Sequence, residues 1–355
     1  MSTMPAYTYD AAPQRVLHGP GRAAELGAEL ARLGARRALL LCSPGQRTLA
    51  ECLAAPLGAG CAGVIATARV HVPVALAQAA AAQARALQAD ALVAVGGGST
   101  QGLAKALALE LALPVLALPT TYAGSEATAI YGLTDQGHKR TGREARVRPL
   151  GVIYDPELSR ALPLATSVAS ALNGMAHAVE ALYAPDASPI TDALARQGLR
   201  LFAQALAGLP AAPQDLALRG RLLSAAWLCG HVLDQTRMGL HHRLCHVLGG
   251  RFDLPHAELH ALLLPHVVAT LAPHMPGPLQ ALRDTLGQSE PAAALQALAD
   301  SAGLPRSLQA LGVPADALAE LARLAADEAR SHPLTPDTAT VLALLQRAHA
   351  GLPAA

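Results

Sequence analysis

Histidine side chains gather in one segment of the second half of the chain, between Gly239 and Ala257. His242 and His246 are four residues apart, so on a helix they project from the same face. His256 follows a glycine break and a proline, which allows the chain to turn back towards that face. One histidine on an apolar helix is usually a hydrogen-bonded core residue, whereas several together favour a catalytic or metal-binding site.

Asn173 and His177 form a second polar pair with the same four-residue spacing, in an otherwise apolar helical run. A divalent metal would take His177, His242 and His256 as ligands, with the amide oxygen of Asn173 as a fourth donor. The amide carries no charge, whereas a divalent cation is usually held with the help of a carboxylate. The residues alone leave both a metal centre and a metal-free site open.

A turn of three glycines and a serine follows the apolar run Ala91–Val95, namely Gly96, Gly97, Gly98 and Ser99. Glycines allow a sharp turn and close approach of a ligand to the backbone. The helical run behind them offers free N–H groups and partial positive charge, which bind phosphate. The segment matches neither the GxGxxG dinucleotide fingerprint nor the GxxxxGK(S/T) phosphate loop, so a plain tight turn remains the alternative.

Hydroxyl groups crowd the loop after the next apolar run, at Thr120, Thr121, Tyr122, Ser125 and Thr128. They suit hydrogen bonds to the phosphate, ribose or amide of a cofactor. The alternative is a turn that ends in a helix cap, and the two roles are compatible.

Cationic side chains are dense from Lys139 to Arg148, with five in ten residues. Such runs are usually solvated loops or edge hairpins. The alternative is attraction of an anionic substrate or of cofactor phosphates, with Lys139 as a candidate contact. Arg243 and Arg251, inside the histidine-rich segment, are better candidates to pair with substrate carboxylates.

The elements that must position these residues follow from the apolar pattern. Short apolar runs alternate with helical stretches at Ala38–Cys42, Gly63–Ala66, Ala91–Val95, Val115–Leu118 and Gly151–Asp155. This alternation predicts βαβ units, and therefore a Rossmann-like parallel-sheet α/β domain over residues 1–156. Only helical patterns follow, which predicts an all-α domain over residues 157–355. The loops at the carboxyl ends of the strands should face one crevice.

Composition excludes several classes of function. The chain has 355 residues, a net charge of +1 and no long basic run, so we expect neither nucleic acid nor membrane as a partner. No apolar run approaches the length of a membrane span, and Met1–Asp10 lacks the features of a secretory signal. The five cysteines form no regular framework, which predicts a reduced, cytoplasmic protein.

The order of these motifs resembles that of the iron-containing (group III) alcohol dehydrogenases. That order is Gly-Gly-Gly-Ser with a later lysine, then Pro-Thr-Thr with Gly-Ser-Glu, then Asn173 before His177, then His242 and His246, and finally Pro255-His256. Within this family, which shares the architecture of dehydroquinate synthase, several stretches are similar to the branch of maleylacetate reductases. The resemblance runs from about Tyr7 to beyond Ala350.

The resemblance implies an α/β domain and a helical domain with a cleft between them, usually in a homodimer. It implies that a small dicarboxylate, maleylacetate or a chlorinated form, is reduced to 3-oxoadipate in aromatic-compound degradation. NADH or NADPH would lie with its phosphates on the glycine turn and its adenosine ribose near Ser43 and Gln46. A carboxylate there would repel a 2′-phosphate, so the absence of one predicts use of both cofactors.

Two residues depart from the metal-dependent members of the family. Gly102 and Asn173 stand at positions where the metal-dependent members carry aspartates. Both replacements resemble those of maleylacetate reductases, so we expect no tightly bound iron or zinc. Hydride delivery into the conjugated substrate puts negative charge on an enolate oxygen. Without a metal, one of the histidines at 177, 242, 246 and 256 would donate a proton or hydrogen bond to it.

Three other functions are compatible with parts of this pattern. One is a metal-dependent alcohol or glycerol dehydrogenase of the same fold, which a metal analysis and a substrate assay would separate. Another is an inactive nucleotide sensor, although such a protein would not need the intact histidine cluster. A lyase of the dehydroquinate synthase kind would require more acidic and lysine residues than we find.

Overall fold

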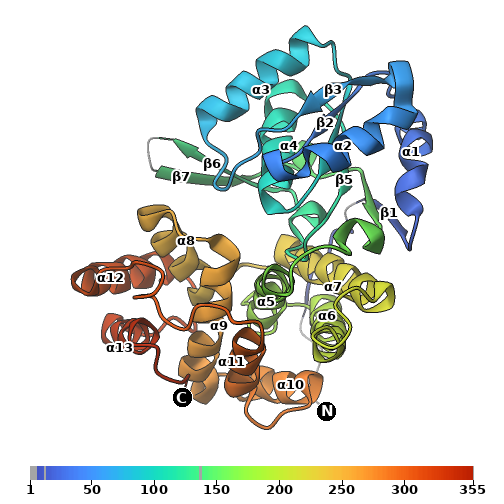
Figure 1. Ribbon diagram of the computed structural model, residues 1–355. Coiled ribbons are helices and arrows are strands. Elements are labelled where there is room, and N and C mark those ends of the chain that lie inside the picture. Colours follow the sequence, from blue (N-terminus) through green and yellow to red (C-terminus); the bar gives the residue numbers. More distant parts are fainter. Residues whose placement is uncertain (1–5, 12, 136–137, 355) are drawn as a thin grey trace. The chain divides into compact units, whose positions relative to one another are not determined.

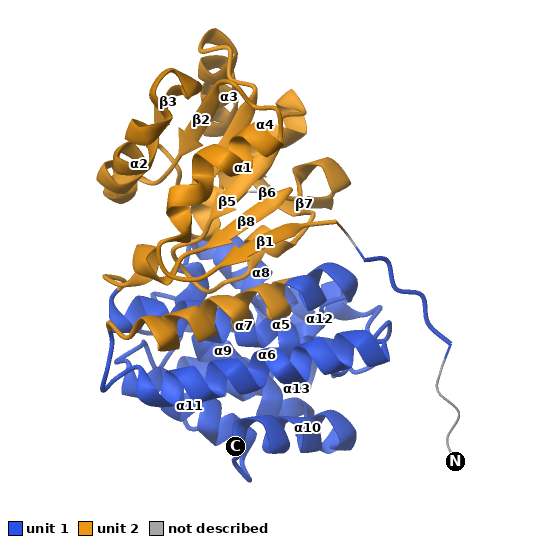
Figure 2. Ribbon diagram, turned by 90° about the vertical axis from the view of Figure 1, so that its right-hand side faces the viewer, with its two compact units in different colours: residues 1–11, 163–213, 231–355 blue, residues 12–162, 214–230 orange. Residues whose placement is uncertain are grey.

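The computed structural model describes residues 6–11, 13–135 and 138–354, without the side chains of residues 138 and 139. The chain forms two compact units (Figure 2). Unit 1 comprises residues 1–11, 163–213 and 231–355, and unit 2 comprises residues 12–162 and 214–230. The units therefore do not follow a single boundary along the chain. Helix α7 (Leu216–Gln235) contributes its first fifteen residues, 216–230, to unit 2 and the others to unit 1.

Unit 2 contains a six-stranded sheet in the order β1-β8-β5-β4-β2-β3, in which every pair of neighbours is parallel. The strands are β1 (Arg15–His18), β2 (Ala38–Leu41), β3 (Cys61–Ile65), β4 (Ala91–Val95), β5 (Val115–Leu118) and β8 (Gly151–Tyr154). The predicted parallel sheet is thus confirmed. Strand β1 has no counterpart in the sequence analysis, because it is an edge strand with mostly exposed side chains.

Four helices of unit 2 cover the sheet: α1 (Leu26–Arg32), α2 (Arg47–Ala54), α3 (Val74–Ala86) and α4 (Gly98–Leu111). Neighbouring residues of a strand point to opposite faces. Leu40 and Val93 belong to a core with α1 and α2, whereas Leu39 and Leu92 belong to a core with α3 and α4. Burial on both faces explains why these strands are continuous apolar runs.

The cationic run forms part of an antiparallel hairpin in unit 2. Strand β6 (Ile130–Asp135) pairs with β7 (His138–Arg143), separately from the main sheet. This agrees with the expectation of an edge hairpin.

Unit 1 is helical in its described residues. Its helices are α5 (Leu164–Ala181), α6 (Pro189–Gly208), α8 (Leu240–Phe252), α9 (His256–Leu271), α10 (Pro276–Leu286), α11 (Pro291–Ser301), α12 (Leu318–Ala329) and α13 (Thr338–His349) (Figure 1). Helix α9 is buried over most of its length and packs against α5, α8, α11 and α13. The predicted all-α second part is confirmed. No helix among the described residues is long and apolar enough to cross a membrane.

Candidate active site

The glycine turn joins β4 to the amino terminus of α4, as predicted. Gly96 has φ of 150°, and a Cβ there would lie 2.5 Å from both Gln46 Oε1 and Thr100 Oγ1. A Cβ on Gly97 would lie 2.8 Å from the side chain of Thr121. No side chain could stand at either position without displacing its neighbours, whereas a Cβ on Gly98 meets nothing within 4 Å. The open space at the start of α4 can therefore receive a ligand.

The loops after β2 and β5 meet at this turn within unit 2. Gln46, in a short 3₁₀ turn (Pro44–Gln46), donates from Nε2 to Thr120 Oγ1 over 2.6 Å. Ser43 Oγ lies 3.4 Å from Gln46 Oε1. Together with Thr121 against Gly97, these contacts surround the glycine turn with short polar side chains. The structure thus brings Ser43, Gln46, Thr120 and Thr121 together with Gly96, Gly97, Gly98 and Ser99.

Ser125, which is half-buried, and Thr128, which is buried, both contact a buried lysine. Lys105 is 1% exposed and donates to Ser125 O (2.6 Å), Thr128 Oγ1 (2.8 Å) and Ile130 O (2.8 Å). A buried ammonium group needs such acceptors, because desolvation without them would be costly. These two residues therefore stabilise the loop, and a direct cofactor contact from them has no support in these contacts.

Tyr122 is likewise a structural residue. Its side chain is completely buried, and its hydroxyl accepts from Arg219 Nη1 over 2.8 Å and donates to Ser159 Oγ over 3.2 Å. These contacts give the predicted cofactor contact of Tyr122 no support, and it stays a prediction. Lys139, another predicted contact, lies in β7, and its side chain lies outside the described part of the structure.

The histidine cluster lies in unit 1, on α5, α8 and α9. Asn173 and His177 of α5 and His242 of α8 are each 6% exposed. The rings of His177 and His242 stack with centroids 5.0 Å apart, and the ring of His246 lies 6.3 Å from that of His242. The structure therefore brings together residues that are about seventy positions apart in the sequence.

Glu180 is the most important residue that the sequence analysis missed. Its Oε2 lies 2.5 Å from Nδ1 of His242, and its Oε1 accepts from the backbone N–H of His241 over 2.9 Å. Burial raises the pKa of this carboxyl, but the hydrogen bond and charge of His242 outweigh it and bring the pKa to about 2. Glu180 follows His177 by three residues, so helical spacing alone could have placed it on the same face.

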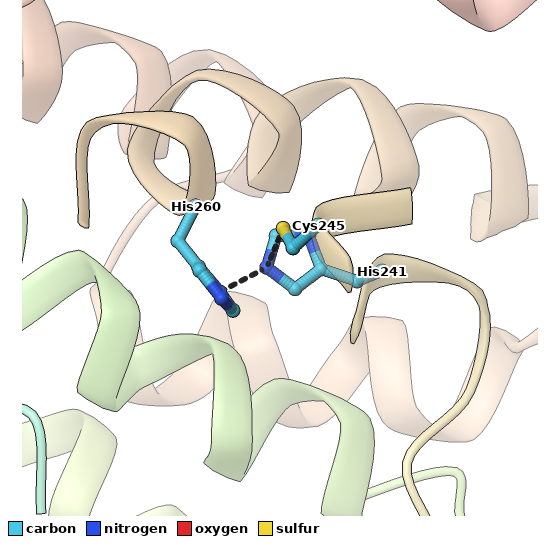
Figure 3. A group of neighbouring side chains, drawn as sticks. All are labelled: His241, Cys245 and His260. Carbon is cyan, nitrogen blue, oxygen red and sulfur yellow. Dashed lines mark hydrogen bonds between the residues drawn. The ribbon is translucent and has the colours of Figure 1, made fainter. Parts of the chain in front are cut away.

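Two further histidines, His241 and His260, were also missed. His241 Nε2 lies 2.8 Å from His260 Nδ1 and 3.7 Å from Cys245 Sγ (Figure 3). Burial lowers the pKa of His241 to about 3 and that of His260 well below its usual value, so both rings are neutral near pH 7. His260 also lies against His256, with ring centroids 4.5 Å apart, and thereby connects His256 to the cluster.

Five buried polar atoms in the cluster have no hydrogen-bond partner among the described residues: Asn173 Oδ1, His177 Nδ1, His241 Nδ1, His242 Nε2 and His260 Nε2. The Glu180 carboxylate fixes a proton on Nδ1 of His242, so Nε2 is the atom that faces a ligand. Such atoms are costly to bury unless something binds them. The cluster is therefore built to receive a polar group.

The residues named as ligands in case a metal binds do not converge on one point in the structure. In the described part of the chain, the three-residue set that converges for a metal is His241, Cys245 and His260, with ligand atoms within 4.8 Å of one another. The imidazoles of His177, His242 and His256 do not form such a set. Their companion Asn173 adds no negative charge, which a divalent cation normally requires.

The two predicted arginines differ in their surroundings. Arg243, in the first turn of α8, is half-buried and forms no ion pair with a described residue. Arg251, in the last turn, is exposed, and its Nη2 lies 3.8 Å from Glu320 Oε2. Eight residues separate them, which is about 12 Å along a helix. Arg243 remains a candidate for a substrate carboxylate, whereas Arg251 makes a surface ion pair.

Comparison with known proteins assigns both parts of the chain. Residues 13–156 match the iron-containing alcohol dehydrogenase family, and residues 167–349 match the C-terminal part of the Fe-containing alcohol dehydrogenase family. The chain is 46% identical over 349 residues to a maleylacetate reductase of Burkholderia cepacia, covering 98% of this chain and 99% of the relative.

Solved structures give the same result. A maleylacetate reductase from Agrobacterium tumefaciens is 45% identical, with a TM-score of 0.91 and coverage of 99% of this chain and 100% of the other. An iron-containing alcohol dehydrogenase from Corynebacterium glutamicum is 37% identical, with a TM-score of 0.92 and coverage of 99% and 98%.

Proposed function

The chain belongs to the iron-containing alcohol dehydrogenase family, and from this premise we propose that it reduces maleylacetate to 3-oxoadipate with NADH or NADPH. Chlorinated maleylacetates are included as substrates. The observation that carries the proposal is the buried Glu180–His242 pair with its unpartnered Nε2, in a chain 46% identical to a maleylacetate reductase.

The glycine turn of unit 2 supports the cofactor part of the proposal. The pyrophosphate would lie on the open backbone at Gly98 and Ser99, at the amino terminus of α4. Thr120 and Thr121 would hydrogen-bond the cofactor beside the turn, and Ser43 would contact the adenosine ribose. Neither Ser43 nor Gln46 is acidic, so both NADH and NADPH are expected to bind.

The histidine cluster of unit 1 supports the chemical part. Maleylacetate carries a C=C bond conjugated to a ketone and to a carboxylate. The reduced nicotinamide would supply a hydride to the carbon β to the ketone. The C=C electron pair would then shift towards the carbonyl carbon, and the carbonyl electron pair would move onto its oxygen to give an enolate. The doubly protonated ring of His242, stabilised by the Glu180 carboxylate, would donate from Nε2 to that oxygen.

The remaining steps balance the reaction. The enol returns to the ketone when a proton from solvent adds to the carbon α to it and the enol O–H proton returns to Nε2 of His242, which yields 3-oxoadipate. Arg243 would pair with one substrate carboxylate, because it forms no ion pair with a described residue. No step passes through a metal, because the donor set at Asn173 does not fit one.

A rate assay tests the proposal. Purified protein is mixed with maleylacetate and NADH, and the loss of reduced-nicotinamide absorbance is followed; the assay is repeated with NADPH and with excess chelator. We expect turnover with both cofactors and no loss on chelation. Oxidation of a simple alcohol or glycerol that depends on added metal, without maleylacetate reduction, would contradict the proposal and favour a metal-dependent dehydrogenase.

The same proposal includes three expectations, about the cellular setting, the functional division of the chain and the oligomeric state. No disulfide joins the five cysteines in the described structure, which fits a reducing, cytoplasmic setting. The functional division would be a cofactor-binding part, residues 1–156, and a catalytic part, residues 157–355. A homodimer is expected from the family alone, and light scattering would measure it.

A further inference from the structure

A cavity lies at the carboxyl ends of β2 and β3, entirely within unit 2. Its volume is about 360 Å³, and its lining is formed by Pro44, Ala66, Thr67, Arg69, Leu76, Ala79, Ala80 and Gln83. Most of these side chains are small and apolar, which suits a flat aromatic base, and no acidic residue lines the space. Pro44 directly follows Ser43, the residue proposed at the adenosine ribose. The cavity therefore lies where the adenosine half of the cofactor would be bound.

Arg69 is the one charged residue of this lining. Its side chain is exposed and forms no hydrogen bond or ion pair with a described residue. Two other arginines of unit 2 are engaged in ion pairs: Arg47 with Glu51 at 3.3 Å, and Arg85 with Glu110 at 2.7 Å. An arginine left free at the rim of a cavity can bind an anion through its planar, two-pronged head group.

The backbone around Arg69 fixes its position beside the loop after β2. Ala68 N donates to Cys42 O over 3.1 Å, which ties this segment to the residue before Ser43. On the other side, Val72 N donates to Arg69 O over 3.4 Å, and Val72 O accepts from Thr134 N over 3.1 Å. The turn that carries Arg69 is therefore held at both ends and does not depend on a ligand for its shape.

We propose that Arg69 binds the 2′-phosphate of NADPH and is a specificity-determining residue of this chain. The proposal rests on the proposed function, because it assumes that a nicotinamide dinucleotide binds at the glycine turn. The ribose of such a cofactor lies at the end of the strand next to the glycine turn, and a nearby arginine accommodates a 2′-phosphate there. Here the strand is β2, and Arg69 comes from the adjacent loop after β3.

Binding of two adenosine fragments tests this without any turnover. Calorimetry would compare 2′,5′-ADP with 5′-AMP on the wild type and on Arg69→Gln. Loss of a charge-assisted contact should weaken 2′,5′-ADP binding about 10- to 100-fold and leave 5′-AMP unchanged. Arg85→Gln, a paired arginine outside the cavity lining, is the matched control and should change neither.

Steady-state kinetics then link the contact to catalysis. In Arg69→Gln the KM for NADPH should rise by the same factor, while the KM for NADH and both kcat values stay at the wild-type level. Equal effects on the two cofactors, or none on NADPH, would overturn the proposal. If the wild type binds 2′,5′-ADP through Arg69 but does not reduce maleylacetate, the proposed function fails while this inference stands.

Discussion

At the scale of single residues, the site depends on a carboxylate that stays ionised inside the protein. Glu180 has no exposed surface, and its pKa of about 2 results from the hydrogen bond and charge of His242 working against burial. The Glu180 carboxylate is therefore ionised near neutral pH. In the proposed mechanism this carboxylate compensates the positive charge of the doubly protonated His242 ring before the ring donates a proton.

Replacement of Glu180 by glutamine should therefore reduce activity more than binding. The amide keeps the shape but not the charge, so we expect kcat for maleylacetate to fall about 100-fold or more, with a small change in KM. Tyr183→Phe is the matched control, because the Tyr183 hydroxyl donates to the same carboxylate over 3.0 Å. That variant should keep its kcat. Equal kcat values for Glu180→Gln and wild type would remove the carboxylate from the mechanism.

At the scale of elements, the glycines of the turn between β4 and α4 have different roles: Gly96 and Gly97 are required by the packing of the protein, whereas Gly98 faces the space for a ligand. The backbone at Gly96 and Gly97 is enclosed by Gln46, Thr100 and Thr121, whereas Gly98 opens to free space at the start of α4. A methyl group at Gly96 collides within the protein. A methyl group at Gly98 meets only what occupies the ligand space.

This contrast gives two opposite expectations. Gly98→Ala should keep the wild-type melting temperature but weaken NADH binding about tenfold, because the added carbon lies where the pyrophosphate would approach. Gly96→Ala should lower the melting temperature, because its Cβ would lie 2.5 Å from two side-chain oxygens at a φ of 150°. Thermal unfolding and fluorescence titration measure the two quantities. Unchanged NADH affinity in Gly98→Ala would place the cofactor elsewhere.

Whether a site residue could be predicted from the sequence depended on the element that carries it. Regular spacing identified Asn173, His177, His242 and His246, because helical residues four apart share a face whatever the tertiary fold. The roles of Ser125, Thr128 and Tyr122 could not be read in this way. Their hydroxyls are used by Lys105 and Arg219, and those contacts depend on how distant segments pack.

At the scale of the whole molecule, continuous apolar runs were enough to predict the central strands, since strands buried on both faces lack polar interruptions. The edge strand β1 has no such run and escaped prediction. The membership of residues 214–230 in unit 2 also could not be predicted, because α7 is one uninterrupted helical pattern. This membership depends on contacts between distant segments, such as the hydrogen bond that Trp227 Nε1 donates to Gln14 Oε1 over 2.9 Å. The local sequence pattern gives no indication of such contacts.

Arg219 should be essential to this long-range packing. It is 1% exposed, and it donates to Tyr122 and, through Nη2, to Leu162 O over 2.9 Å. Arg219→Ala removes the buried donor of both hydrogen bonds, so urea unfolding should show a loss of about 3 kcal/mol. Arg221→Ala, an exposed neighbour on α7, should change stability by less than about 0.5 kcal/mol. Similar losses in both variants would show that the buried contacts contribute little.

Buried neutral histidines should make the whole molecule sensitive to mild acid. Burial, with the nearby charge of Arg347, lowers the pKa of His266 from 6.5 to about 4, whereas in the unfolded chain it would titrate near 6.5. The unfolded state therefore binds more protons than the folded state between these values, so stability falls as the pH drops from 6.5 towards 4. The melting temperature should fall across this window, and His266→Gln should flatten that fall, because the amide cannot take up the proton. His274→Gln, at an exposed position, should follow the wild-type curve. If His266→Gln and wild type lose stability in parallel, the acid sensitivity arises from other groups.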